Sequence, residues 1–205
     1  MGPPSEIAKP DAVRRIRRIQ TITVGWMIVE GAVSLVLAWR AHSPALLVFG
    51  GDSAIELLSA IAVLWRFRKG TEAQKAEYRA SLIGGVLLFA LSGYVVVTAI
   101  RSLLGYAEPK PTYAGILILV TASVVMPWLA REKRRLSLLT GSAALRADAA
   151  ESALCGYLAL IALVGVAVHA AWHIRLADPI AALVITPLII SEGRAAVRGK
   201  SCACS

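Results

Sequence analysis

Long apolar segments alternate with short polar segments along the whole chain. The apolar segments cover residues 19–39, 44–65, 80–104, 112–130, 143–172 and 179–191. Most of them reach the roughly 20 residues that a helix needs to cross about 30 Å of hydrocarbon. The last is shorter and contains Pro187, but Asp178 and Pro179 suit the cap and the first turn of a helix. The pattern predicts an all-α membrane protein built as a six-transmembrane-helix bundle.

Composition and charge support a membrane protein. Of the 205 residues, 57% are hydrophobic and 17% are charged, whereas soluble domains carry about 45–50% apolar and about 25% charged residues. The net charge of +9 does not indicate a nucleic-acid partner, because the basic residues form short blocks between apolar segments. Three cysteines are too few for a disulfide framework. We expect a multi-pass integral protein of a plasma (inner) membrane, with the lipid bilayer as its main partner.

The basic blocks predict the orientation in the membrane. They lie at one end of each successive pair of segments, and the positive-inside rule assigns that end to the cytoplasm. Both termini are then cytoplasmic. The chain divides into a basic tail (1–18), a transmembrane domain (19–191) and a short second tail (192–205). The blocks are formed by Arg14, Arg15, Arg17 and Arg18; Arg66, Arg68, Lys69, Lys75 and Arg79; Arg131, Lys133, Arg134, Arg135 and Arg146; and Arg194, Arg198 and Lys200.

Ionisable residues lie inside the second and fifth apolar segments. Asp52 and Glu56 are four residues apart, and Asp148, Glu151 and Cys155 follow one another at spacings of three and four. Each set therefore occupies one helix face. An aspartate at the centre of a membrane helix costs about 2.5–3.5 kcal/mol on insertion scales, which indicates a functional role. With about 1.5 Å of rise per residue, antiparallel helices would place Glu56 opposite Glu151 and Asp52 opposite Cys155 near the midplane.

Such a group of side chains fits a divalent cation. Carboxylates held together at low dielectric repel one another and take up protons, whereas a divalent ion supplies positive charge and displaces those protons. Carboxylate and thiolate ligands suit a four-coordinate metal such as Zn²⁺ and argue against Mg²⁺ or Ca²⁺. We expect Asp52, Glu56, Glu151 and Cys155 to be the metal ligands. Exchange of metal for protons at the midplane is what a secondary antiporter needs.

Other roles for the acidic residues are open. They could bond to the backbone or pair with basic residues and so hold helices together. However, no lysine or arginine is expected at midplane depth, since Arg101 and Arg146 lie near helix ends and can reach the interface. Asp148 could cap the fifth helix, pair with Arg146 or form a cytoplasmic gate. Glu30, in the first segment, could be an accessory ligand, a proton relay or a buried acid bonded to a serine.

Three stretches resemble the cation diffusion facilitator family, whose members are proton-coupled exporters of zinc and related metals. The resemblance implies six spans, cytoplasmic termini and a tetrahedral site on spans two and five. "GGDSAIELLSA" is similar to the family's second-span stretch and aligns Asp52 and Glu56 with its two ligands. "ALRADAAESALCGYLAL" resembles the fifth-span pattern ADAxHxxxDxxxS and aligns Glu151 with the histidine and Cys155 with the aspartate. "ADPIAALVI" resembles the start of the sixth span.

The chain also departs from the family pattern. A carboxylate replaces the histidine and a thiol replaces the aspartate, so the family's metal preference does not carry over. The cytoplasmic C-terminal domain through which many members dimerise is not found, which leaves a homodimer as an open alternative. His169 and His173 could form a weak outer metal site, although an interfacial pair is the better explanation. Cys202 and Cys204 could capture metal, carry a lipid or have no role.

The function expected from these observations is divalent metal cation transport, most simply Zn²⁺ efflux coupled to proton antiport. The metal is then the transported substrate, no cofactor is expected, and the chain is not an enzyme. A membrane-embedded metalloenzyme is one alternative, disfavoured because the sequence contains no HExxH-type motif. A non-transporting assembly protein, in which the acids join helices, is the other.

Overall fold

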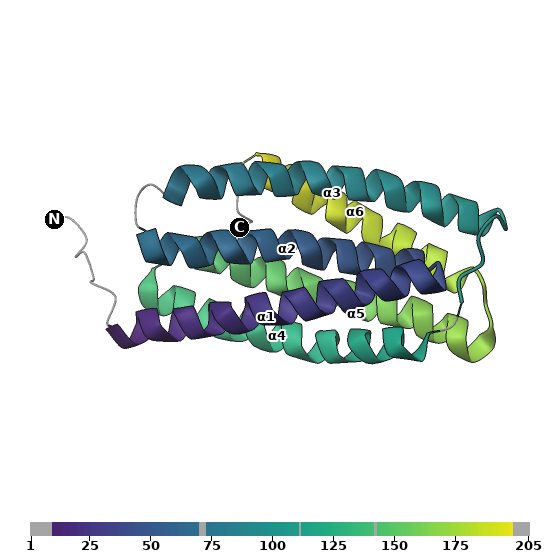
Figure 1. The fold of residues 1–205 in the computed structure, drawn as a ribbon, viewed down its shortest axis with the longest axis horizontal. Helices are drawn as coiled ribbons and strands as arrows, with labels where there is room; N and C mark the ends of the chain where they lie inside the picture. The colour runs from purple at the N-terminus through teal and green to yellow at the C-terminus, as the bar shows by residue number, and fades with distance from the viewer. Residues whose placement is uncertain (1–9, 70–72, 111, 142, 199–205) are drawn as a thin grey trace.

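The computed structural model describes residues 10–69, 73–110, 112–141 and 143–198. Within these ranges the chain forms six helices that lie side by side along the long axis of an elongated bundle (Figure 1). The expected all-α six-helix bundle is confirmed. The helices are α1 (Pro10–Ala41), α2 (Pro44–Lys69), α3 (Ala73–Leu103), α4 (Tyr113–Thr140), α5 (Ala143–Trp172) and α6 (Ala177–Val197).

The outer surface of the bundle suits contact with lipid. Four of the described helices, α1, α3, α4 and α5, contain stretches long and apolar enough to cross a membrane. Each of them also carries large apolar side chains on its outer face. Contact between this apolar surface and water is unfavourable, whereas contact with lipid tails carries no such cost. Examples that are more than half exposed are Val36, Val86, Val124 and Val164.

Segments expected to be loops at one end of the bundle are largely helical. α4 continues through most of 131–142 to Thr140, and Gly141 ends it in the left-handed conformation with a φ of 63°. α2 and α3 together cover most of 66–79, and α6 continues past Ser191 to Val197. An apolar segment marks only the part of a helix that lipid can cover, whereas the helix itself ends where backbone hydrogen bonding ends.

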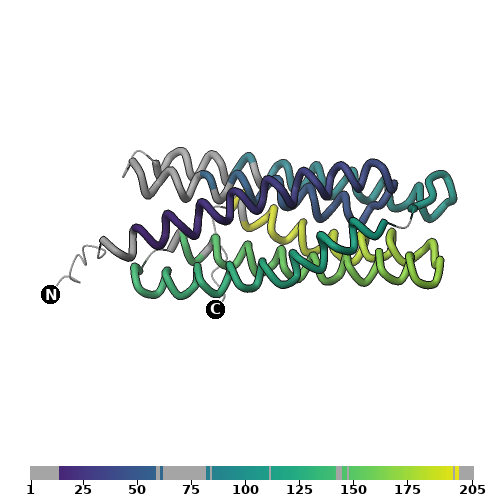
Figure 2. Tube along the Cα trace, turned by 60° about the horizontal axis from the view of Figure 1, so that its bottom comes forward, coloured from purple at the N-terminus to yellow at the C-terminus, as the bar shows by residue number. Residues whose placement is uncertain are grey.

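The interior is arranged around α2, α5 and α6. The pairs α1–α2, α4–α5 and α3–α6 pack most extensively, and α2 also contacts both α5 and α6. α6, in yellow, lies between α3 and α5 in both views (Figures 1 and 2). Side chains on the facing sides of α2 and α5 are therefore shielded from the outer surface.

Gly165 on α5 allows α6 to approach closely. A Cβ at this position would lie 2.4 Å from the Cβ of Ala181 and 3.2 Å from the carbonyl oxygen of Ala177. We expect Gly165→Ala to lower the free energy of unfolding by about 1–3 kcal/mol, because the two helices must separate. Reversible unfolding in detergent micelles measures the change. Gly93→Ala is the control, since a Cβ there meets no described atom within 4 Å; equal losses in both variants would contradict the close contact.

Candidate metal centre

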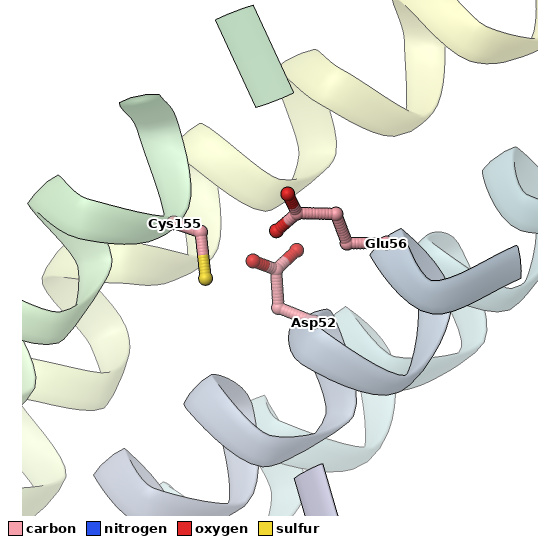
Figure 3. Close-up of side chains that lie close together, drawn as sticks. All are labelled: Asp52, Glu56 and Cys155. Atoms are coloured by element: carbon pink, nitrogen blue, oxygen red, sulfur yellow. The ribbon is translucent and has the colours of Figure 1, made fainter. Parts of the chain in front are cut away.

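Asp52, Glu56 and Cys155 converge between α2 and α5. Their side chains point toward one another (Figure 3), and one ligand atom from each lies within 4.8 Å of the other two. All three residues are buried. Ligands at about 2.0–2.3 Å from a tetrahedral ion stand about 3.5 Å apart, so a contraction of about 1 Å would let these atoms hold one metal ion. The structure thus brings together three of the four ligands expected from the sequence.

Helical spacing explains why these side chains face inward. Both helices carry a buried stripe at intervals of three and four residues, which is one face of an α-helix. The polar residues of the site occupy positions in these stripes that apolar residues occupy elsewhere. The stripes are formed by Phe49, Asp52, Ser53 and Glu56 on α2 and by Asp148, Ser152, Cys155 and Ala159 on α5.

Two further acids lie at the edge of the cluster. Glu151, the fourth expected ligand, is half-buried and lies outside the group of three, within electrostatic range of Asp52. Glu192 on α6 interacts electrostatically with Asp52, Glu151 and Glu56. The sequence analysis placed Glu192 in a tail beyond the helices. Its position three residues after the buried Ile189 was the available signal, because that spacing continues the inner face of α6.

Glu30 on α1 borders the cluster and is fully buried. Its Oε1 accepts hydrogen bonds from the Ser53 hydroxyl at 2.7 Å and from the Cys155 thiol at 3.6 Å. Its Oε2 accepts a hydrogen bond from the Trp26 indole. The bond to a serine, one of the three roles considered for Glu30, is present. With both oxygens accepting hydrogen bonds, Glu30 acts here as an acceptor beside the three converging side chains.

A buried lysine overturns the expectation that no basic residue lies at the depth of the acids. Lys133 on α4 is fully buried, and its Nζ donates to the Ser152 hydroxyl at 2.7 Å. Ser152 in turn donates to Glu56 Oε1 at 2.8 Å. The basic composition of residues 131–135 indicated a solvated loop, but the helical period placed Lys133 on the buried face. That face is formed by Met126, Leu129, Ala130, Lys133, Leu136 and Ser137.

Asp148 pairs with this lysine and not with Arg146. Its Oδ1 lies 3.0 Å from Lys133 Nζ, and its Oδ2 accepts a hydrogen bond from Gln20 Nε2 at 2.6 Å. Arg146 is exposed. Ion pairing was among the expected roles, but the partner was wrong, because a lysine 15 residues away on α4 is closer in space than the arginine two residues away along α5.

His169, near the end of α5, lies in a network of backbone contacts. Its Nδ1 lies 3.1 Å from the carbonyl oxygen of Ile174, and its Nε2 lies 2.9 Å from that of Pro109. Both ring nitrogens are therefore engaged, whereas His173 is exposed. These contacts favour the interfacial explanation over an outer metal site. Cys202 and Cys204 lie outside the described residues.

The chain is similar to known transport proteins. The family model of the cation efflux transmembrane domain matches residues 21–199. The chain belongs to the cation efflux family. The resemblance to the cation diffusion facilitators is thereby confirmed, and the chain is a multi-pass integral protein of the plasma membrane.

One relative of this chain is the manganese efflux system protein MneS of Bacillus subtilis. The two are 24% identical over 177 residues, which cover 82% of this chain and 61% of the relative. The chain therefore spans less than two thirds of the length of that relative.

Proposed function

We propose that this protein exports divalent transition-metal cations, foremost Zn²⁺, from the cytoplasm in exchange for protons. The observation that carries the proposal is the convergence of Asp52, Glu56 and Cys155 inside the bundle. Membership of the cation efflux family supports the general activity. Glu151 is proposed as the fourth ligand, because it borders the group on α5 and interacts with Asp52.

The donor atoms support zinc over manganese. Manganese prefers carboxylate, carbonyl and water oxygens, whereas Zn²⁺ also binds thiolate sulfur well. Cys155 contributes such a sulfur to a cluster that is otherwise made of carboxylates. The relative named for manganese efflux is only 24% identical over the matched residues, so its metal does not decide the preference of this chain.

The charges around the cluster support exchange with protons. Among the described residues around the cluster, the acids Glu30, Asp52, Glu56 and Asp148 are buried, and Lys133 is the one buried lysine, paired with Asp148. If all were ionised at once, their repulsion and the cost of desolvating them would be large. Protons relieve this repulsion in the empty protein, and an arriving metal displaces the protons from its ligands. Relative motion of packed helix groups would then expose the site to each side in turn.

Transport by the purified protein in liposomes tests this function. A pH gradient should drive Zn²⁺ accumulation, and a trapped pH dye should report proton movement in the opposite direction. Cadmium, cobalt, manganese and iron ions are compared under the same conditions. Absence of flux for every metal would refute transport, and zinc flux that ignores the pH gradient would refute proton exchange.

Cys155→Asp tests the contribution of sulfur to metal preference. We expect the ratio of Zn²⁺ to Mn²⁺ affinity to fall at least about tenfold, equivalent to about 1.4 kcal/mol, because a hard oxygen replaces the soft sulfur. Titration calorimetry with both metals measures the ratio. Cys155→Ser is the control, since it removes the thiol without adding a carboxylate and should weaken zinc without improving manganese. An unchanged ratio in the aspartate variant would exclude Cys155 as a ligand.

A further inference from the structure

The two oxygens of Glu56 have different surroundings. Oε1 accepts the hydrogen bond from Ser152, and Ser152 accepts one from Lys133 Nζ. Oε2 is buried and has no hydrogen-bond partner among the described residues. A buried carboxylate oxygen without a partner is costly, so this atom points to a ligand. Glu56 is one of the three residues whose ligand atoms converge.

We propose that Lys133 is a positioning residue for the metal site. Acting through Ser152, it fixes Oε1 of Glu56 and leaves Oε2 directed to the ion. The inference rests on the proposed function and adds to it a residue from a further helix, α4. Groups that hydrogen-bond to metal ligands orient them and change metal affinity, although they never touch the metal.

Lys133 is itself held in place by α1 and α5. Asp148 pairs with its ammonium group, and Gln20 binds the other oxygen of Asp148. The Asp148 carboxylate thus offsets much of the positive charge of Lys133, so the lysine repels a bound cation less than an unpaired lysine would. Lys133 also interacts electrostatically with Glu56, and its directed contact with this carboxylate runs through the Ser152 hydroxyl. These contacts link α1, α4, α5 and α2 in one hydrogen-bond network.

Ser152→Ala is the direct test, because it breaks the link and preserves the ion pair. Titration of the purified full chain with Zn²⁺ should show affinity weaker by about 10–100-fold, the usual effect of losing a group that orients a ligand. Ser137→Ala is the control. Ser137 is also buried, but its hydroxyl bonds to the carbonyl oxygen of Arg134 on its own helix, so zinc affinity should not change.

A second, charge-balanced variant tests Lys133 without leaving an unpaired charge. Lys133→Met/Asp148→Asn should weaken zinc binding to a similar degree. Adding Ser152→Ala should cause little further loss of zinc affinity, because all three changes break the same hydrogen-bond network. A purely structural ion pair would instead alter thermal stability and leave zinc affinity unchanged.

The outcomes separate this inference from the proposed function. Unchanged zinc affinity in Ser152→Ala, or fully additive losses in the combined variant, would overturn the positioning role. If Asp52→Asn still abolishes binding in that case, the metal site itself stands. If the wild-type chain binds no zinc, or if Asp52→Asn binds as tightly as wild type, the proposed function fails and the positioning role fails with it.

Discussion

Asp52→Asn should weaken zinc binding at least about 100-fold and reduce transport to background. Loss of a hydrogen-bonded neighbour of a ligand already costs about 10–100-fold, so loss of a ligand's charge should cost more. The amide has nearly the same shape as the carboxylate, and Asp52 is buried, so packing is preserved while one anion is removed. Titration calorimetry gives the affinity, and flux into liposomes gives the transport rate.

Glu108→Gln is the control for this variant. It makes the same chemical change on an exposed residue between α3 and α4, which pairs with Arg175 between α5 and α6, so binding and transport should match wild type. Near-wild-type zinc affinity in a folded Asp52→Asn protein would remove the central support for the proposed site.

Lys133→Met should lower the free energy of unfolding by about 3–5 kcal/mol. The reason is that Asp148 then remains buried without its partner, and breaking a buried ion pair costs more than removing it whole. Lys133 and Asp148 are both almost fully buried, with their charged atoms 3.0 Å apart. Adding Asp148→Asn should recover most of the loss, since an amide carries no charge. Reversible denaturation in mixed detergent micelles measures the three proteins.

Lys110→Met is the matched control, because Lys110 is exposed and the same substitution there should change stability by less than about 0.5 kcal/mol. If Lys133→Met were as stable as wild type, or if Asp148→Asn failed to rescue it, the buried pair would not contribute as its geometry indicates.

The C-terminal helix ends predicted from the sequence differ most from the structure at α4 and α6. The lengths of the apolar segments and the charges that follow them predicted helix ends near residues 130 and 191. Both helices continue beyond these positions, and each extension carries a residue that interacts with the buried acids. Lys133 and Glu192 were assigned to polar segments because these segments are rich in charged residues, although the helical spacing of apolar residues continues into them. The buried positions of Leu129 and Ile189 show that the period was the better guide.

The explanation of the acids as helix joints was partly right. Asp148 does join α5 to α4 and α1 through Lys133 and Gln20. Asp52 and Glu56 differ from it, because they converge with Cys155, and because one buried oxygen of Glu56 has no hydrogen-bond partner in the described part of the chain. Donors from other helices reach both oxygens of Asp148 but only one oxygen of Glu56. Residues of one type thus take different roles, according to whether an oxygen remains available for a ligand.

The sequence alone determined the apolar helices, their alternating direction and the polar faces of α2 and α5, because each of these follows from spacing within one segment. The tertiary structure alone decided that Lys133 reaches Glu56 through Ser152, that Glu30 meets Cys155, and that Glu151 lies at the edge of the cluster. These contacts join residues from different helices, up to 125 positions apart along the chain. Their distances depend on how far neighbouring helices approach and rotate, and no periodicity within a single helix encodes that.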